Sequence, residues 1–439
     1  MGAAGDMVEV EIAALGARGD GIAERDGQRL FVPFSVPGDR LRVRIGDAEG
    51  DGLRATIVER LADGSGRRAP VCRHFASCGG CVAQHLGDAA YGAWKTGMAA
   101  DALARCGFDR GLVAPLRRIA PGTRRRARLK ARRAAEGVSL GFFAPASHRV
   151  VDLAECPVLA PPLVALLPAL RAALGGVLGA GEGCEAAVTL TATGIDLVLA
   201  LGRPANTALR SRLAAFAEAA DLARLSVRQT GRRGGPAPPA EPVAARRPVQ
   251  VSFGAVPVDL PPDAFLQPTA EGERFLAAAV VEALAGRKRV ADLFSGCGAF
   301  ALPLLAAGCH VHAADSAGDH VLALEGAARR AGLGAQLAAG VRDLARRPLA
   351  VADLAGLGGM VLDPPRPGAP AQARALAESP VPVVVYVSCN PASFARDART
   401  LADGGYALEA VTPLDQFVFS PHLELVGIFT KEAGKRRRR

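Results

Sequence analysis

Long apolar segments are absent from this chain of 439 residues, in which no uninterrupted run reaches the roughly 18 apolar residues of a membrane-spanning helix. The N-terminus also lacks the basic, apolar and small-residue regions that make up a secretory signal. Aromatic residues are only 5% of the chain, with a single tryptophan. We therefore expect no membrane partner and a cytoplasmic location.

Cysteine is too unevenly spread for a disulfide framework, since three of the nine cysteines (Cys72, Cys78 and Cys81) lie within ten positions. Cys156, which is followed by Pro157, supplies a fourth thiol further along the chain. Four thiolates fit either a tetrahedral zinc ion or an iron–sulfur cluster, and the spacing alone does not decide between them. The Cys-Pro pair is typical of ferredoxin ligation and favours the cluster.

The length and the charge of the chain indicate several domains and an anionic partner. At 439 residues the chain is about three times a ~150-residue domain, which predicts two to four domains. The net charge is +10 and the isoelectric point about 9.5, so the surface should attract a polyanion. Nucleic acid is the first candidate and an anionic membrane the second.

Three patterns divide the chain. From Val8 to about Leu61, short alternating runs between Gly, Asp and Pro turns predict a small β-barrel of the OB type or another five-stranded kind. Residues 231–248 are rich in Gly, Pro and Ala and indicate a loop or a domain junction. From Asp263 onward, apolar runs of strand length alternate with helical patterns, which predicts a parallel α/β sheet.

An arginine-rich stretch from Arg117 to Arg133 follows the cysteine cluster. It predicts a surface that contacts phosphates, and the alternative is a solvated face of an arginine-rich strand. The basic residues at 435–439 predict a cationic tail that assists encounter with RNA without specifying a sequence.

A glycine-containing turn begins the α/β region. Asp292 to Gly298 ends one predicted strand and leads into an apolar helix, and glycines there allow a ligand to approach the backbone closely. About twenty positions later, Asp315 ends the next strand, where a carboxylate can hold a ribose diol. The pair predicts a nucleoside cofactor. A NAD-type site remains open, although the complete G-x-G-x-x-G spacing is missing.

Two further strand ends carry chemistry. Asp363 follows the strand 360–362 and precedes two prolines, which fix a rigid loop and aim the carboxylate into the ligand crevice. Cys389 follows the apolar run 383–388 and is a candidate nucleophile, with a buried structural thiol as the alternative. Glu424 lies in an apolar strand. It is either a surface-facing residue or a carboxylate that faces a cavity. In a cavity, burial would raise its pKa into the range of a catalytic base.

Together these residues resemble the RNA uracil-5-methyltransferase family, whose members combine a TRAM barrel, an iron–sulfur domain and a methyltransferase domain. The segments 15–23, 31–33 and 36–39 resemble the TRAM signature, and the resemblance covers nearly the whole chain. It implies a multidomain protein with an N-terminal OB-like β-barrel (TRAM), a central α+β iron–sulfur domain and a C-terminal α/β Rossmann-like class I methyltransferase domain. The implied boundaries are 1–62, 63–262 (with part of 83–117 packed on the catalytic domain), 263–434 and a tail at 435–439.

The resemblance also implies roles for individual residues. The implied ligands of a [4Fe-4S] cluster are Cys72, Cys78, Cys81 and Cys156. The residues implied to bind S-adenosyl-L-methionine or the uracil edge are Gln267, Phe294, Asp315 and Asp363. The implied nucleophile is Cys389 and the implied base is Glu424. Asp315 stands where the family usually has Glu, which shortens the reach to the ribose by one methylene.

The implied activity is methylation of carbon 5 of a uridine in RNA, with S-adenosyl-L-methionine as the methyl donor. The four cysteines match the 23S rRNA branch of the family best. Alternatives are a tRNA substrate with the same chemistry, a cytosine-5-methyltransferase, which the Asp-Pro-Pro-Arg and Ser-Cys-Asn-Pro motifs disfavour, and a non-catalytic RNA-binding assembly factor. We infer no obligate protein partner.

Overall fold

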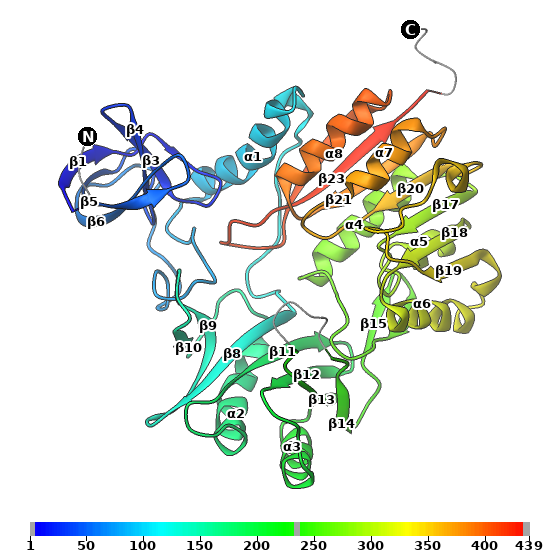
Figure 1. Ribbon diagram of the computed structural model, residues 1–439, viewed down its shortest axis with the longest axis horizontal. Coiled ribbons are helices and arrows are strands. Elements are labelled where there is room, and N and C mark those ends of the chain that lie inside the picture. The colour runs from blue at the N-terminus through cyan, green and yellow to red at the C-terminus, as the bar shows by residue number, and fades with distance from the viewer. Residues whose placement is uncertain (1–4, 232–237, 433–439) are drawn as a thin grey trace.

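A computed structural model describes residues 5–231 and 238–432, and the predicted basic tail at 435–439 lies outside the described residues. Three sheets of six, seven and eight strands follow one another along the chain (Figure 1). No helix in the described part is both long and apolar enough to cross a membrane.

The N-terminal sheet has strand order β1-β5-β6-β4-β3-β2 and is antiparallel except for the β4–β6 pair. Alternate residues point inwards, so that Leu30 and Val32 of one strand pack against Leu41 and Val43 of another in a small core. Its strands are β1 Met7–Glu11, β2 Ala14–Leu15, β3 Gly21–Arg25, β4 Gln28–Val32, β5 Arg40–Glu49 and β6 Gly52–Ala62.

The central sheet has strand order β10-β9-β8-β11-β12-β13-β14, and its core includes leucines of helices α2 and α3. Figure 1 shows both helices beneath this sheet. Its elements are β8 Arg126–Ala134, β9 Gly137–Phe143, β10 Val150–Asp152, α2 Pro161–Val177, β11 Gly183–Thr191, β12 Gly194–Leu201, α3 Thr207–Ala219, β13 Arg224–Gln229 and β14 Glu241–Ala245. A hairpin of β15 Gln250–Phe253 and β16 Val256–Asp259 leads to the third sheet.

The C-terminal sheet has strand order β19-β18-β17-β20-β21-β23-β22-β7. Strands β17 to β21 run parallel, and β23 is antiparallel to its neighbours. The elements are α4 Ala270–Ala283, β17 Arg289–Leu293, α5 Ala301–Ala306, β18 His310–Asp315, α6 Gly318–Arg330, η2 Gly334–Gln336, β19 Leu337–Val341, η3 Val351–Leu354, β20 Gly359–Leu362, α7 Pro370–Glu378, β21 Val383–Ser388, α8 Pro391–Asp403, β22 Ala407–Asp415 and β23 Glu424–Thr430.

One segment from before the central sheet also belongs to this C-terminal unit. Helix α1 (Asp88–Arg105) buries Ala99, Ala102 and Leu103 in the core that α8 and β21 form, and lies beside α8 in Figure 1. The turn η1 (Arg110–Leu112) follows, and β7 (Arg117–Arg118) then pairs with β22 at the edge of the sheet. A segment that precedes the central sheet in the sequence therefore packs on the C-terminal unit.

Candidate active site

The parallel strands of the C-terminal sheet bring three of the predicted site residues to one edge. β17 pairs with β20, and β20 pairs with β21, all in parallel. Phe294, Asp363 and Cys389 each come directly after one of these strands. Because parallel strands end at the same edge of a sheet, these residues lie at the position where such folds usually bind a ligand, which we call the crevice.

The turn after β17 is built for a ligand close to the backbone. Phe294 has a φ of 64° and Gly298 a φ of 98°, both in the left-handed region. Asp315 fixes the turn, since its Oδ2 accepts a hydrogen bond of 2.9 Å from the backbone N–H of Gly296 and its Oδ1 one of 2.8 Å from Ala317. Each carboxylate oxygen keeps a further lone pair that can accept a ribose hydroxyl.

Replacing Gly298 with alanine should weaken this turn. A Cβ at this position would lie 2.5 Å from Cδ1 of Leu324, at a φ that alanine adopts poorly. We expect the stability to fall by about 1–3 kcal/mol and the affinity for S-adenosylhomocysteine to fall with it, as measured by thermal unfolding and calorimetry. Gly340→Ala is the matched control, because no heavy atom lies within 4 Å of its Cβ. Equal stability and affinity in the two variants would contradict this interpretation of the turn.

A chain of amide and carboxyl groups links the crevice to Glu424. Gln267 donates its side-chain N–H to Oδ2 of Asp363 at 3.0 Å. Gln416 donates to Oε1 of Gln267 at 2.7 Å and to Oε2 of Glu424 at 3.0 Å. Gln267, Gln416 and Glu424 are all buried. The arrangement therefore fixes four polar side chains relative to one another inside the protein.

Burial raises the pKa of both carboxyl groups in this chain. Desolvation, followed by the negative charge of Asp363, raises the pKa of Glu424 well above its ordinary value. Desolvation raises the pKa of Asp363 to about 7, although the hydrogen bond from Gln267 opposes the shift. A carboxylate with a raised pKa is a stronger base once it is ionised. Glu424 is only 2% exposed, so the surface-facing alternative for this residue is wrong.

Cys389 is half-buried and lies between the end of β21 and the start of α8. Desolvation, followed by the charges of Glu424 and Asp363, raises the pKa of its thiol to about 11, and Arg366 opposes this shift. The thiol therefore carries its proton at neutral pH in the free protein. A nucleophile in this position must lose that proton when the substrate arrives.

Gln416 is a site residue that the sequence reasoning missed. Gln416 comes directly after β22, which ends at Asp415. Asp363 and Cys389 likewise come directly after their own strands. The polar pair Asp415-Gln416 at the end of an apolar strand was the available signal. Asp292, where the predicted glycine-containing turn begins, is fully buried near the end of β17, and desolvation raises its pKa to about 8.

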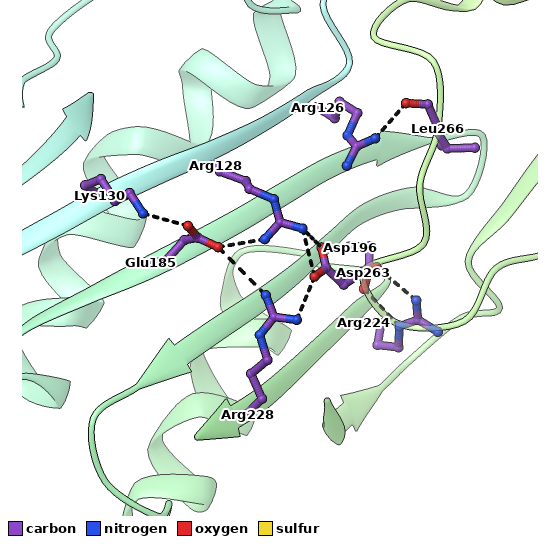
Figure 2. A network of polar contacts seen from close by, with 9 residues as sticks. All are labelled: Arg126, Arg128, Lys130, Glu185, Asp196, Arg224, Arg228, Asp263 and Leu266. Carbon is purple, nitrogen blue, oxygen red and sulfur yellow. Dashed lines mark hydrogen bonds and ion pairs between the residues drawn. The ribbon is translucent and has the colours of Figure 1, made fainter. Parts of the chain in front are cut away.

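Most arginines of β8 and of the segment before it contact other residues of the protein. Most of this stretch therefore does not form the freely exposed phosphate-binding surface that the sequence predicted. Figure 2 shows Arg128 between Glu185 and Asp263, with Lys130 and Arg228 completing the network. Arg126 donates to the carbonyl of Leu266 at 2.7 Å (Figure 2), and the adjacent Arg125 donates to the carbonyl of Gln267 at 3.1 Å. These contacts attach the loop of Gln267 to the central sheet.

The four predicted cluster cysteines line one cavity of about 330 Å³. Desolvation raises the pKa of Cys81 to about 12, and the neighbouring thiols add to the shift. Among the described residues, no group of three His, Cys, Asp or Glu side chains is placed closely enough to hold a metal ion. The wall of the cavity also includes residues of the loop that precedes Glu424, namely Val418, Ser420, Pro421 and His422.

Comparison with known proteins places this geometry in a family. The family described as TRAM domain matches residues 4–58, and the family described as tRNA (Uracil-5-)-methyltransferase matches residues 335–433. An uncharacterized RNA methyltransferase of Brucella melitensis is 40% identical, over 96% of this chain and 98% of its own. A protein of Halomonas elongata described as 23S rRNA (uracil(1939)-C(5))-methyltransferase is 36% identical, over 95% of this chain and 88% of its own.

A solved structure shows the same fold. The tRNA (uracil-54, C5)-methyltransferase of Pyrococcus abyssi, in complex with S-adenosyl-L-homocysteine, superimposes with a TM-score of 0.74 at 20% identity and covers 96% of this chain and 100% of its own. The predicted N-terminal TRAM domain and C-terminal methyltransferase fold are therefore confirmed, whereas the iron–sulfur nature of the central domain stays a prediction. The chain belongs to the RNA uracil-5-methyltransferase family.

Proposed function

We propose that this S-adenosylmethionine-dependent methyltransferase modifies carbon 5 of a uridine in 23S rRNA, with Cys389 as nucleophile and Glu424 as base. The observation that carries the proposal is the convergence of Cys389, Asp363 and Glu424 at one edge of the sheet. The amides of Gln267 and Gln416 join Asp363 to Glu424. The relative from Halomonas elongata, whose description specifies 23S rRNA, supports the choice of substrate.

The chemistry follows from the reactivity of uracil. Carbon 5 is a weak nucleophile, so the Cys389 thiol first gives up its proton to solvent and its thiolate Sγ adds to carbon 6. The ring becomes an enolate that is nucleophilic at carbon 5. S-adenosyl-L-methionine, when bound, supplies an electrophilic methyl group. After carbon 5 has gained the methyl, Glu424 removes the proton from carbon 5, the carbon 5–carbon 6 double bond reforms and the thiolate leaves.

The surrounding residues suit the remaining tasks. The half-buried Asp363 and the amide of Gln267 offer hydrogen bonds to a uracil edge, and Asp315 with Phe294 lines the nucleoside turn. The target uridine has to leave its stack to reach Cys389, which costs a few kcal/mol and least in a single-stranded loop. The TRAM domain and the exposed basic side chains contribute phosphate contacts that do not depend on the RNA sequence.

The substrate is tested by mapping 5-methyluridine by mass spectrometry in 23S rRNA and tRNA from cells that lack this protein. We expect one or more uridines of 23S rRNA to lose their methyl group while tRNA is unchanged, and restoration by the wild-type gene. Loss confined to tRNA would establish the alternative substrate. An unchanged methylation pattern in both RNAs would favour a non-catalytic assembly factor.

We propose further that Cys72, Cys78, Cys81 and Cys156 hold a [4Fe-4S] cluster. The support is the set of four thiols around a single cavity and the proline after Cys156. A [4Fe-4S] cluster takes one thiolate from each of four cysteines, and these four cysteines line a single cavity. An RNA substrate and reduced thiols together favour a cytoplasmic location.

Replacing Cys78 with serine should remove the cluster. We expect the iron content and the visible absorbance of anaerobically purified protein to be lost, and RNA binding or stability to fall, because the cluster joins the loop of Cys78 to Cys156. Cys184→Ser is the matched control, since Cys184 is also buried in the central domain but lies outside this cavity. If Cys78→Ser loses its iron but keeps RNA binding and stability, a structural role for the cluster is wrong.

A further inference from the structure

The loop between β22 and β23, residues 416–423, leads directly to Glu424 and is held from outside the C-terminal sheet. Val82 and Ala83 donate their backbone N–H groups to the carbonyl of Phe419 at 2.8 Å and 3.1 Å. In Figure 1 this loop extends from the sheet towards the segment that precedes α1. The position of the proposed base therefore depends on a part of the chain more than 300 residues away.

Lys95 of α1 contacts both ends of this loop. It is fully buried, and its Nζ lies 2.9 Å from Oδ1 of Asp415, the residue directly before the loop. The same ammonium group donates to the carbonyl of His422, two residues before Glu424. One side chain thus fixes the entry and the exit of the loop.

Tyr91, one turn earlier on α1, makes a second set of contacts. Its hydroxyl donates to Oδ2 of Asp415 at 2.6 Å and accepts from the backbone N–H of Phe419 at 2.9 Å. Phe419 has a φ of 63°, a conformation that a non-glycine residue holds only where its surroundings impose it. Tyr91 and Lys95 therefore fix the start, the middle and the end of the loop.

A buried ion pair is an expensive way to stabilise a fold. Desolvation of two charges offsets most of their attraction, and apolar residues of similar size often stabilise a protein as well or better. The pair Lys95–Asp415 is nevertheless fully buried, beside the amide of Gln416 that binds Glu424. A buried ion pair ties its two residues to one geometry, which apolar contacts of similar size do not do as specifically.

We propose that Lys95 and Asp415, together with Tyr91, are positioning residues that hold Gln416 and Glu424 in place for the removal of the carbon 5 proton. This inference rests on the proposed function and adds residues to it. The proposal gives none of the three a contact with the RNA or the methyl donor. Their loss should therefore leave addition of Cys389 and methyl transfer largely intact and slow the release of the methylated RNA.

The experiment uses Tyr91→Phe, Lys95→Met and the double variant Lys95→Met/Asp415→Asn of the full-length protein, with transcribed 23S rRNA fragments and radiolabelled S-adenosylmethionine. Tyr91→Phe keeps the ring and loses only the two hydrogen bonds, and the double variant leaves no unpaired buried charge, so both remain informative if Lys95→Met does not fold. Denaturing gels measure the fraction of enzyme that carries methylated RNA covalently, and steady-state assays give kcat and KM.

We expect kcat to fall about 10- to 100-fold, less than the roughly 10²- to 10⁴-fold that a general base contributes, because the base is displaced and not removed. The KM for RNA should be unchanged and the methylated adduct should accumulate. The control Arg224→Met/Asp196→Asn removes a buried ion pair of the central sheet, at 2.9 Å (Figure 2), and should show no adduct accumulation. A positioning role is wrong if the folded variants release RNA at the wild-type rate, or if addition and release slow equally. A wild-type enzyme that makes no 5-methyluridine would instead refute the proposed function.

Discussion

Cys389→Ala should abolish methylation, with a loss of about 10⁴-fold or more in kcat/KM, as expected when a catalytic nucleophile is removed. The side chain has no substitute in the crevice, because the groups around it are the carboxyls of Asp363 and Glu424 and the guanidinium of Arg366. A carboxylate or a guanidinium cannot add to carbon 6 as a thiolate does. The initial rate of methyl transfer to RNA measures the effect.

The matched control for this prediction is Cys106→Ala. Cys106 is also a half-buried free thiol, but it lies at the C-terminal end of α1, away from the strand ends that form the crevice. We expect that variant to keep full activity. Substantial methylation by Cys389→Ala would show that another group attacks carbon 6 and that the assignment of the nucleophile is mistaken.

Glu424→Gln should separate methyl transfer from release. A glutamine keeps an oxygen that can accept the hydrogen bond from Gln416 but cannot take up the carbon 5 proton. We expect kcat to fall about 10²- to 10⁴-fold, the usual contribution of a general base. In a single turnover the methyl group should still reach the RNA, which then stays attached to Cys389.

An exposed glutamate of the neighbouring strand provides the control. Glu409 lies on β22 and accepts a hydrogen bond from Thr430, so Glu409→Gln makes the same chemical change away from the crevice. That variant should release product normally. Free methylated RNA formed by Glu424→Gln at the wild-type rate would mean that a different group acts as the base.

The parallel strands of the C-terminal sheet could be predicted well from the sequence. Strands covered on both faces read as continuous apolar runs, and β20 and β21 are buried throughout. The position of Asp363 and Cys389 at the edge of the sheet could be predicted for the same reason, since the first polar residues after such runs lie at the edge where ligands bind. Local pattern was sufficient there because each residue's place follows from its own strand.

The central sheet shows where local pattern is insufficient. The arginines of the stretch from Arg117 to Arg133 suggested a phosphate surface, yet Arg125 and Arg126 hold the carbonyls of Gln267 and Leu266. Their partners are about 140 residues away in the sequence. A charge pattern gives no information about such partners.

The same limit explains the missed residues of the site. Lys95 reads as an ordinary charged position on the helix α1, and nothing local indicates its burial against Asp415. Gln416 gains its meaning only when β22 and β23 pair and place it beside Glu424. Contacts between distant segments, which fix the arrangement of these side chains, become visible only in the folded chain.

The most direct test of the account is trapping with RNA that contains 5-fluorouridine at the target position. Fluorine at carbon 5 replaces the proton that Glu424 would remove, so the enzyme should stop after methyl transfer with Cys389 bound to carbon 6. We predict a stable protein–RNA adduct that depends on S-adenosylmethionine, with peptide mass mapping placing the nucleotide on Cys389. An active preparation that forms no adduct, or forms it on another residue, would contradict the mechanism.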